Sequence, residues 1–379
     1  MPALEPVLER LLPAKLGGPF RRVFASSLAG NLGDGLLLSA GPLLVARLTP
    51  DPLLISLAPV ASQLPWIALS LFAGILADRM PRVRLMVLAS TCRALVLGGL
   101  VALLLTGALT IPLLYLALFA LGAALPYGAA GVTTLLALWA IAGLRMPEHR
   151  DETTGSMPVG GAIARVRREL GSGFRWLWGH AAIRSLAIIL FAFNITFGMT
   201  WGVLVVYAKE VLGLDAAGYG LLMTASAIGG LLGTACYGML ERRFSYAGMM
   251  RTLLCVEVLV HLGFALTTSW AVAAAILFVF GAYGTIWGTI SGTIRGRAVP
   301  SRMRGRVSSV YLLGMFGGTA LGSPLGGLLA QQAGVTTTMW WAGIGTAVVL
   351  AIVWRMIPAI GAAGEHGPED EAATPDSVA

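Results

Sequence analysis

Long apolar runs separated by short polar turns fill most of the chain. A bilayer core of roughly 30 Å requires about 20 apolar residues in a helix that rises 1.5 Å per residue. Runs of that length flank a basic turn at Gly74–Arg84, and six more follow residue 183. The pattern predicts an all-α polytopic membrane protein with about ten transmembrane helices.

The polar segments between these runs divide the chain into five parts. We predict a cytoplasmic lead at 1–19, an N-terminal bundle of about four spans at 20–144, a cytoplasmic linker at 145–183, a six-helix bundle at 184–356 and a disordered acidic cytoplasmic tail at 357–379. Within the linker, Ala162–Trp178 has amphipathic spacing with basic residues on one side. Such a pattern is typical of a helix lying on the inner membrane surface.

The apolar run Ile111–Leu144 is 34 residues long, too long for one upright helix and too short for two with a loop. The basic turn before it and the arginine-rich linker after it both belong on the cytoplasmic side. This run therefore crosses the membrane an odd number of times, and three crossings do not fit. It predicts one crossing, tilted or broken near Gly122–Gly128.

Composition supports membrane insertion, because only 12% of the residues are charged, about half the usual share of a soluble domain. The net charge is +8, and the basic residues are concentrated on one predicted side of the membrane: all 26 Lys/Arg fall in segments on that side except Arg47, Arg93 and Lys209. This is the positive-inside pattern, and it argues against nucleic-acid binding. With arginine far commoner than lysine, as in GC-rich bacteria, we expect a multi-pass protein of a bacterial inner membrane. Both termini should be cytoplasmic, without a cleaved signal peptide.

The two halves of the chain contain related segments. Gly74–Arg79 is echoed by Gly238–Arg243, and each closes the second helix of its half and opens a basic turn. Internal repeats are typical of transporters. The same offset leaves the penultimate helix of the second half without a counterpart in the first. The long apolar run then corresponds to the front of a fourth helix fused to the back of a sixth.

Two motifs resemble the major facilitator superfamily. Gly74, Asp78, Arg79, Arg82 and Arg84 resemble the superfamily's loop 2–3 signature. Arg304–Ser309, followed by Gly318, Gly322, Pro324, Gly326 and Gly327, is similar to the enterobactin-exporter and macrolide-efflux branch. The resemblance implies a secondary transporter with two bundles around a central cavity, here with four plus six helices instead of twelve.

The resemblance also implies an inner gate at the first motif. Asp78, with Arg79, Arg82 and Arg84, would bind a neighbouring helix N-terminus, for which the start near Arg304–Val307 is the best candidate. The alternative is that these residues only orient the chain.

Asp34, close to Asn31, lies midway along the first apolar run. An intramembrane carboxylate costs roughly 2.5–3.5 kcal/mol on insertion scales, so it should face the bundle interior. It is a candidate proton acceptor or cation contact, and Asn31 is a candidate cavity residue. The alternative is a polar strut between helices.

Glu257 and His261 are one helical turn apart in the third span of the second half. At this spacing they share a face and could relay a proton. Alternatively, they line a vestibule or pair with another helix, because the resemblance places this helix at the bundle's periphery.

Asn194, Phe197 and Trp201 share one helix face, and Phe280, Tyr283 and Trp287 repeat the spacing on another helix. By resemblance these helices line the central cavity, where aromatic rings and an amide suit a bulky amphipathic substrate. Packing or a lipid-facing surface is the alternative.

Motifs for other chemistry are not found in the sequence: it contains no phosphate-binding glycine loop, zinc-ligand spacing or nucleophile elbow. The three cysteines fall inside apolar runs. We therefore expect no enzyme activity, metal or cofactor, with an ion gradient as the energy source. The favoured hypothesis is a proton-coupled antiporter that exports a drug, siderophore or secondary metabolite. The alternative is a degenerate, non-transporting membrane scaffold.

Overall fold

The computed structural model describes residues 39–79, 82–124 and 159–365. Short turns connect helices in these ranges, and they contain no strand. A helix pairs its own backbone N–H and C=O groups, as a segment in hydrocarbon must. The predicted all-α fold is confirmed.

Two compact units divide the chain. One comprises Met1–Gly41 with Ala61–Ile163, and the other comprises Pro42–Val60 with Ala164–Ala379. The segment Pro42–Val60, which the sequence places in the N-terminal bundle, thus groups with the helices of the C-terminal half.

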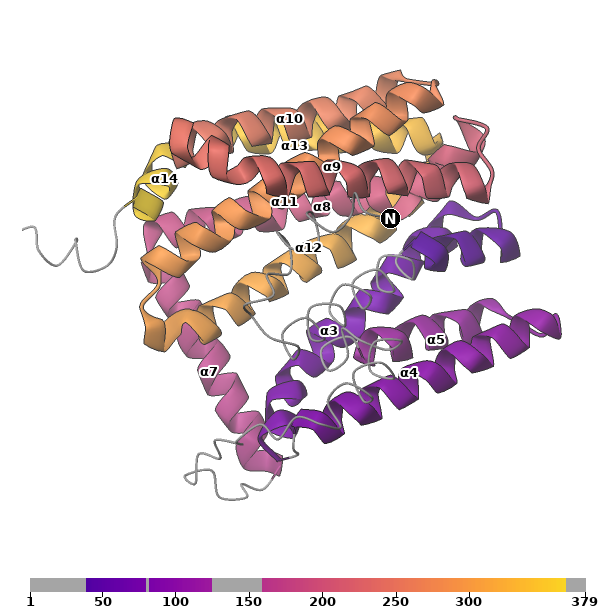
Figure 1. Ribbon diagram of the computed structural model, residues 1–379, viewed down its shortest axis with the longest axis horizontal. Helices are drawn as coiled ribbons and strands as arrows, with labels where there is room; N and C mark the ends of the chain where they lie inside the picture. Colours follow the sequence, from indigo (N-terminus) through magenta and orange to yellow (C-terminus); the bar gives the residue numbers. More distant parts are fainter. Residues whose placement is uncertain (1–38, 80–81, 125–158, 366–379) are drawn as a thin grey trace, which may run out of the picture. The chain divides into compact units, whose positions relative to one another are not determined.

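The first unit contains the second part of α3 (Pro52–Arg79), α4 (Arg82–Leu105) and α5 (Ile111–Ala124). α4 and α5 pack side by side as an antiparallel pair joined at Gly107, whose φ is 67° (Figure 1). Gly122 of α5 lies against the Ser62 carbonyl, where a side chain would not fit. The rest of the long apolar run, beyond Ala124, lies outside the described residues.

The second unit contains the C-terminal helices. They are α7 (Val159–Gly179, from Ala164 on), α8 (Ala181–Glu210), α9 (Ala216–Arg243), α10 (Tyr246–Leu266), α11 (Trp270–Ala298), α12 (Arg304–Ala333), α13 (Val335–Val353) and α14 (Ile357–Glu365). α8 to α13 are long and apolar enough to cross a membrane, α12 together with the short 3-10 turn before it. They occupy the six stretches that the apolar runs predict. α7 and α14 lie at the end of the bundle where α8 begins (Figure 1).

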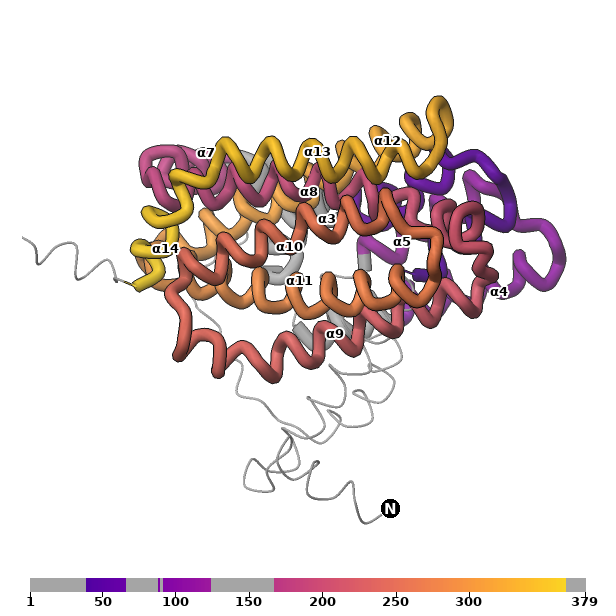
Figure 2. Tube along the Cα trace, turned by 90° about the horizontal axis from the view of Figure 1, so that it is seen from above, coloured from indigo at the N-terminus to yellow at the C-terminus, as the bar shows by residue number. Residues whose placement is uncertain are grey.

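Small residues bring two pairs of helices into close contact. On α12, Gly318 and Gly322 lie against the α8 backbone carbonyls of Phe191 and Ile195. α9 and α11 approach in the same way: Gly229 lies against the Phe278 carbonyl. Small residues allow such approach of backbones in lipid, where van der Waals contact drives helix association. In Figure 2, α10 lies between α13 and α11, and α11 lies between α10 and α9.

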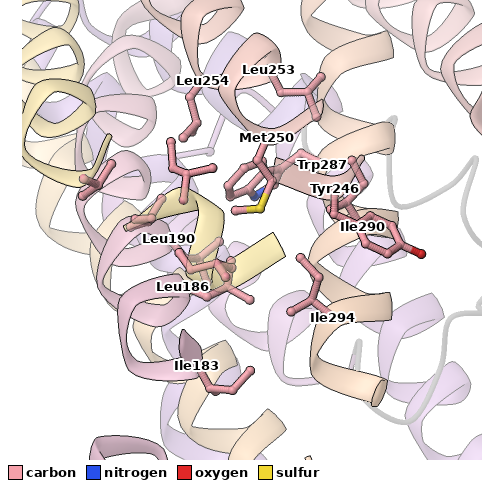
Figure 3. Close-up of a cluster of buried hydrophobic side chains, with 14 of the residues drawn as sticks. Ile183, Leu186, Leu190, Tyr246, Met250, Leu253, Leu254, Trp287, Ile290 and Ile294 are labelled. Carbon is pink, nitrogen blue, oxygen red and sulfur yellow. The ribbon is translucent and has the colours of Figure 1, made fainter. Parts of the chain in front are cut away.

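A hydrophobic core joins α8, α10 and α11 toward the α7 end of the bundle. Figure 3 shows Leu186 and Leu190 from α8 beside Met250 from α10, with the Met250 side chain and the Trp287 indole directed toward each other. A thioether next to an aromatic ring contributes about 0.3–1.5 kcal/mol beyond burial. Trp287, predicted to line a cavity, is 9% exposed and forms part of this core.

The first turns of α3 pack on α12 at the opposite end of this unit. Gly327 lies so close to Leu53 and Ser56 that a side chain on it would overlap the Ser56 hydroxyl. The Gln331 amide donates to Asp51 Oδ1 at 3.2 Å, and Asp51 also accepts from the Leu53 N–H at 2.8 Å. The start of α3 is therefore held against the end of α12.

The predicted disordered tail begins with a helix instead. α14 packs on α10 and α11, with Ile357 and Ile360 fully buried. Gly361 lies against the Ala247 backbone, and the Arg297 guanidinium donates to the Gly364 carbonyl at 2.9 Å. Burial of two isoleucines offsets the low helix propensity of the glycines. Residues 366–379 lie outside the described residues.

Candidate functional site

Three polar side chains form a buried chain of hydrogen bonds between α8 and α10. Thr200 Oγ1 is 2.8 Å from His261 Nδ1, and His261 Nε2 is 3.2 Å from Glu257 Oε1. Glu257 is 2% exposed and His261 is 1% exposed. We assign the Nε2 proton to the bond with the carboxylate, so that Nδ1 accepts from the threonine hydroxyl.

The second carboxyl oxygen of Glu257 is buried, and among the described residues no donor lies in hydrogen-bond geometry to it. The Tyr283 side chain, from α11, faces this carboxyl group. An unsatisfied buried acceptor costs roughly 1–3 kcal/mol, so this oxygen is expected to take a donor or a proton. A proton added to Glu257 Oε2 would turn this oxygen into a donor.

Four aromatic rings from α8 and α11 cluster beside this polar chain. The Phe197 ring centroid lies 5.2 Å from that of Trp201 and 5.8 Å from that of Phe280. The Phe280 ring lies 5.4 Å from Trp201 and 5.7 Å from Tyr283. These distances fall in the favourable range for aromatic pairs. Phe197, Trp201 and Phe280 are half-buried, so the cluster keeps an accessible surface.

Tyr283 belongs to both groups. Its ring packs against Phe280, and its side chain faces the Glu257 carboxyl group. At 8% exposure it separates the aromatic surface from the buried glutamate. The arrangement places a titratable pair one side chain behind an aromatic contact surface.

Asn194 uses its amide for packing between helices. Nδ2 donates to the Leu190 carbonyl at 2.8 Å, and Oδ1 accepts from Thr319 of α12 at 3.2 Å. Ser323 on the next turn of α12 donates to the Gly198 carbonyl at 3.1 Å. The structure thus places Phe197, Trp201 and Tyr283 in the aromatic cluster, Asn194 at the α8–α12 contact and Trp287 in the hydrophobic core.

The other predicted site residues are outside the part whose side chains the structure describes. Asn31 and Asp34 lie among residues 1–38. Of the gate motif, Gly74, Asp78 and Arg79 occupy the last two turns of α3, and Arg82 and Arg84 the first turn of α4. The inner-gate role of this motif stays a prediction.

Sequence reasoning missed Thr200. The sequence feature that could have pointed to Thr200 is its position three residues after Phe197 on the same helix. This spacing directs both side chains to one flank of α8. Nothing in the local sequence relates it to His261, 61 positions later. Within the described ranges no group of three or more His, Cys, Asp or Glu could hold a metal ion.

Comparison with known proteins agrees with this architecture. Residues 15–125 and 115–375 match the family described as transmembrane secretion effector, MFS_3. Uncharacterized MFS-type transporters of Mycobacterium bovis and Mycobacterium tuberculosis are 32% identical over 204 residues. That match covers 52% of this chain and 44% of each relative, so the chain matches less than half of their length.

Solved structures of low sequence identity share the fold. A crystal structure of a mutant of the nucleoside transporter NupG superposes with a TM-score of 0.67 at 13% identity, covering 89% of this chain and 99% of that chain. A bacterial homologue of the human lysosomal transporter Spinster, in an inward-facing and unoccupied conformation, gives 0.57 at 13% identity, with 91% and 98% covered. The chain belongs to the transmembrane secretion effector family of the major facilitator superfamily.

Proposed function

We propose that the protein is a secondary active transporter that exports a hydrophobic or amphipathic small molecule in exchange for protons. The observation that carries the proposal is the position of Tyr283, between the aromatic cluster and the buried Glu257 carboxyl group. Cargo bound at the rings and a proton bound at Glu257 would both lie next to the Tyr283 side chain. Such proximity would couple the two ligands directly, because binding of each would change the surroundings of the other.

The distribution of charge supports an orientation for the second unit. Every described arginine from Arg167 onward lies near the end where α8 begins, and Lys209 lies at the other end. By the positive-inside rule the arginine-rich end is cytoplasmic. In a bacterial inner membrane, the Asp51–Gln331 contact would then lie on the outer side.

The aromatic cluster is the proposed cargo contact. Its accessible rings offer apolar area and faces on which another ring or an organic cation can stack. The cluster carries no charged side chain of its own. Recognition would then depend on ring area more than on a specific polar pattern, as suits a hydrophobic or amphipathic compound.

The Glu257–His261 pair is the proposed proton site. A proton can reside on the imidazole, as an ion pair with the carboxylate, or on Glu257 Oε2, next to Tyr283. In both cases the Nε2–H can donate to Oε1, which lies 3.2 Å from Nε2 in the structure. Asp34 remains a second candidate for coupling in the other unit.

A second candidate function is a non-transporting scaffold that derives from such a transporter. The observation that favours it is the family match, which falls in two segments overlapping at 115–125, inside the long apolar run. Two segments meeting there agree with a fused helix and a shortened N-terminal half. A bundle of four spans need not close a transport path.

Flux in proteoliposomes separates the two candidates. The purified full chain would be reconstituted in vesicles with an acidic lumen, and uptake of ethidium, rhodamine 6G and a hydroxamate siderophore would be followed with and without nigericin. We expect gradient-dependent accumulation of at least one probe. In Glu257→Gln we expect gradient-driven uptake to fall at least tenfold, while exchange of labelled for unlabelled probe continues.

Glu210→Gln is the matched control, because Glu210 is an exposed glutamate at the far end of α8. It should transport like the wild type. Gradient-driven flux that survives in Glu257→Gln would remove the pair from the coupling mechanism. No gradient-dependent flux of any probe in the wild-type protein would favour the scaffold.

A further inference from the structure

α7 has two chemically distinct faces. One packs on the bundle: Leu177 is 2% exposed, and Gly173 lies against the Arg306 backbone at the start of α12, where a Cβ would come within 2.6 Å of the carbonyl oxygen. The other face carries Phe174 and Trp178, which are 52% and 50% exposed. Two large rings on the side away from the bundle contribute nothing to its core.

These two rings form an ordered surface feature. Their centroids are 5.3 Å apart with 19° between the planes, so they stack across one turn of the helix. The Arg184 guanidinium donates to the Trp178 carbonyl at 2.9 Å and fixes the helix end beside the stack. The rings are thus presented on a rigid element.

Arginines border the stack on the same face. Arg167, Arg168 and Arg175 are all exposed. In helical projection Arg167 lies in line with the rings, and Arg168 and Arg175 lie about 100° and 80° from it. Glu169 is half-buried and about 200° from Arg167, so it does not neutralise this face. We call Arg167, Arg168, Phe174, Arg175 and Trp178 the α7 surface.

We propose that the α7 surface binds anionic phospholipid of the cytoplasmic leaflet. This inference rests on the proposed orientation of the chain. Tryptophan at the level of the headgroups and arginine reaching the phosphates are the usual anchors at a membrane interface. Basic residues near an anionic leaflet are attracted to its surface charge, so three arginines should favour an anionic lipid over a neutral one.

Lipid bound here would act on the element that leads to the candidate site. After His180, α7 continues directly into α8, which carries Phe197, Thr200 and Trp201. The Gly173 contact also holds α7 to the start of α12. The lipid would therefore fix the linker helix in the interface plane and set the position of the α8 end.

A fluorophore on the surface tests the proposal without relying on transport. Gly171 is exposed and lies between the rings and Arg175 in projection, and a Cβ added to it would meet no atom of the described residues within 4 Å outside its own helix backbone. Gly171→Cys would be introduced into the full chain with its three cysteines replaced by serine, and labelled with bimane. Nanodiscs of phosphatidylcholine and phosphatidylglycerol at 7:3 would carry a nitroxide on the acyl chain of one lipid or the other. We expect at least twofold stronger quenching from the labelled phosphatidylglycerol, declining in 0.5 M NaCl.

Charge-matched variants identify the source of the preference. The triple variant Arg167→Gln, Arg168→Gln, Arg175→Gln should quench equally with both labelled lipids. Arg242→Gln, Arg243→Gln, Arg355→Gln removes the same charge from exposed arginines outside α7 and should keep the preference. If both labelled lipids quenched bimane equally in the protein that keeps the three α7 arginines, the proposal would be overturned. No quenching at all would also overturn it, as expected if a second copy or another protein covered this face.

Discussion

His261 and Glu257 hydrogen-bond across one turn of α10, with 3.2 Å between Nε2 and Oε1 and almost no exposure of either side chain. In a buried pair, removal of one partner leaves the other with an uncompensated polar group. The pair therefore has two separable properties. Its hydrogen bond supports the fold, and its ability to change charge supports the proposed coupling.

Substitutions at Glu257 separate these properties. Glu257→Gln keeps an acceptor for the His261 N–H, so its free energy of unfolding should be close to that of the wild type. Glu257→Leu leaves that donor unpaired and should lower the free energy of unfolding by about 1–3 kcal/mol. Thermal unfolding in detergent, followed by tryptophan fluorescence, compares the two variants. Glu210→Leu, at an exposed position, is the control and should be neutral. Equal stability of Glu257→Leu and Glu257→Gln would contradict a structural role for the bond.

The aromatic cluster predicts a loss of cargo affinity at Phe280, whose ring contacts three others at 5.4–5.8 Å. Each aromatic pair contributes about 0.5–1.5 kcal/mol, so Phe280→Ala should weaken binding of an aromatic probe about tenfold. Titration of ethidium by fluorescence anisotropy measures this. Trp270→Ala removes a larger ring that is 58% exposed at the start of α11, and affinity should not change. A comparable loss in Trp270→Ala would indicate nonspecific partitioning of the probe.

How much of this structure the sequence predicts depends on the range of the interactions involved. The lengths of apolar runs specify the six C-terminal spans, because each helix pairs its own backbone groups. Helical spacing also places Phe280 and Trp287 on nearly one face of α11. They differ in burial because they are seven residues apart, about 10 Å along the axis: Trp287 is a buried member of the core around Met250, whereas Phe280 is partly buried and packs against that core. Which residues pack against a face is a tertiary property that spacing does not contain.

α14 and Thr200 illustrate the same limit. The sequence from Ile357 is rich in small residues and lacks a strong helical signal, yet close packing of Gly361 on Ala247 accommodates a helix. Thr200 becomes part of the site only through a partner on another helix, His261. Contacts of this kind depend on how helices pair, and that pairing is determined by small residues distributed over several spans.

The α8–α12 contact predicts a steric effect at Gly322. A side chain at this position would overlap the Ile195 carbonyl, and helix backbones cannot yield as a flexible side chain can. We expect Gly322→Val to lower the free energy of unfolding by about 1–3 kcal/mol, the usual cost of overpacking. Gly317→Val is the matched control on the same helix, because its nearest neighbour is Phe191 Cε2 at 4.0 Å. Thermal midpoints in detergent compare the two, and equal midpoints would mean that the helices can separate at no cost.

The contact between Gly327 and the start of α3 predicts a change in accessibility at the end of the bundle opposite α7. A valine side chain at position 327 would overlap the Ser56 hydroxyl and press on the Leu53 backbone, so Gly327→Val should displace this segment from α12.

Ser56 is fully buried, and Ser56→Cys, in a chain without its native cysteines, should react slowly with a membrane-impermeant maleimide. Adding Gly327→Val should raise the labelling rate at least fivefold. Gly314→Val should leave the rate unchanged, because a Cβ at this position would meet no atom within 4 Å in the described part of the chain. Because Gly327→Val would hold this end open, it should also slow any transport cycle in which the end must close. Unaltered labelling would show that the α3–α12 contact does not determine access to Ser56.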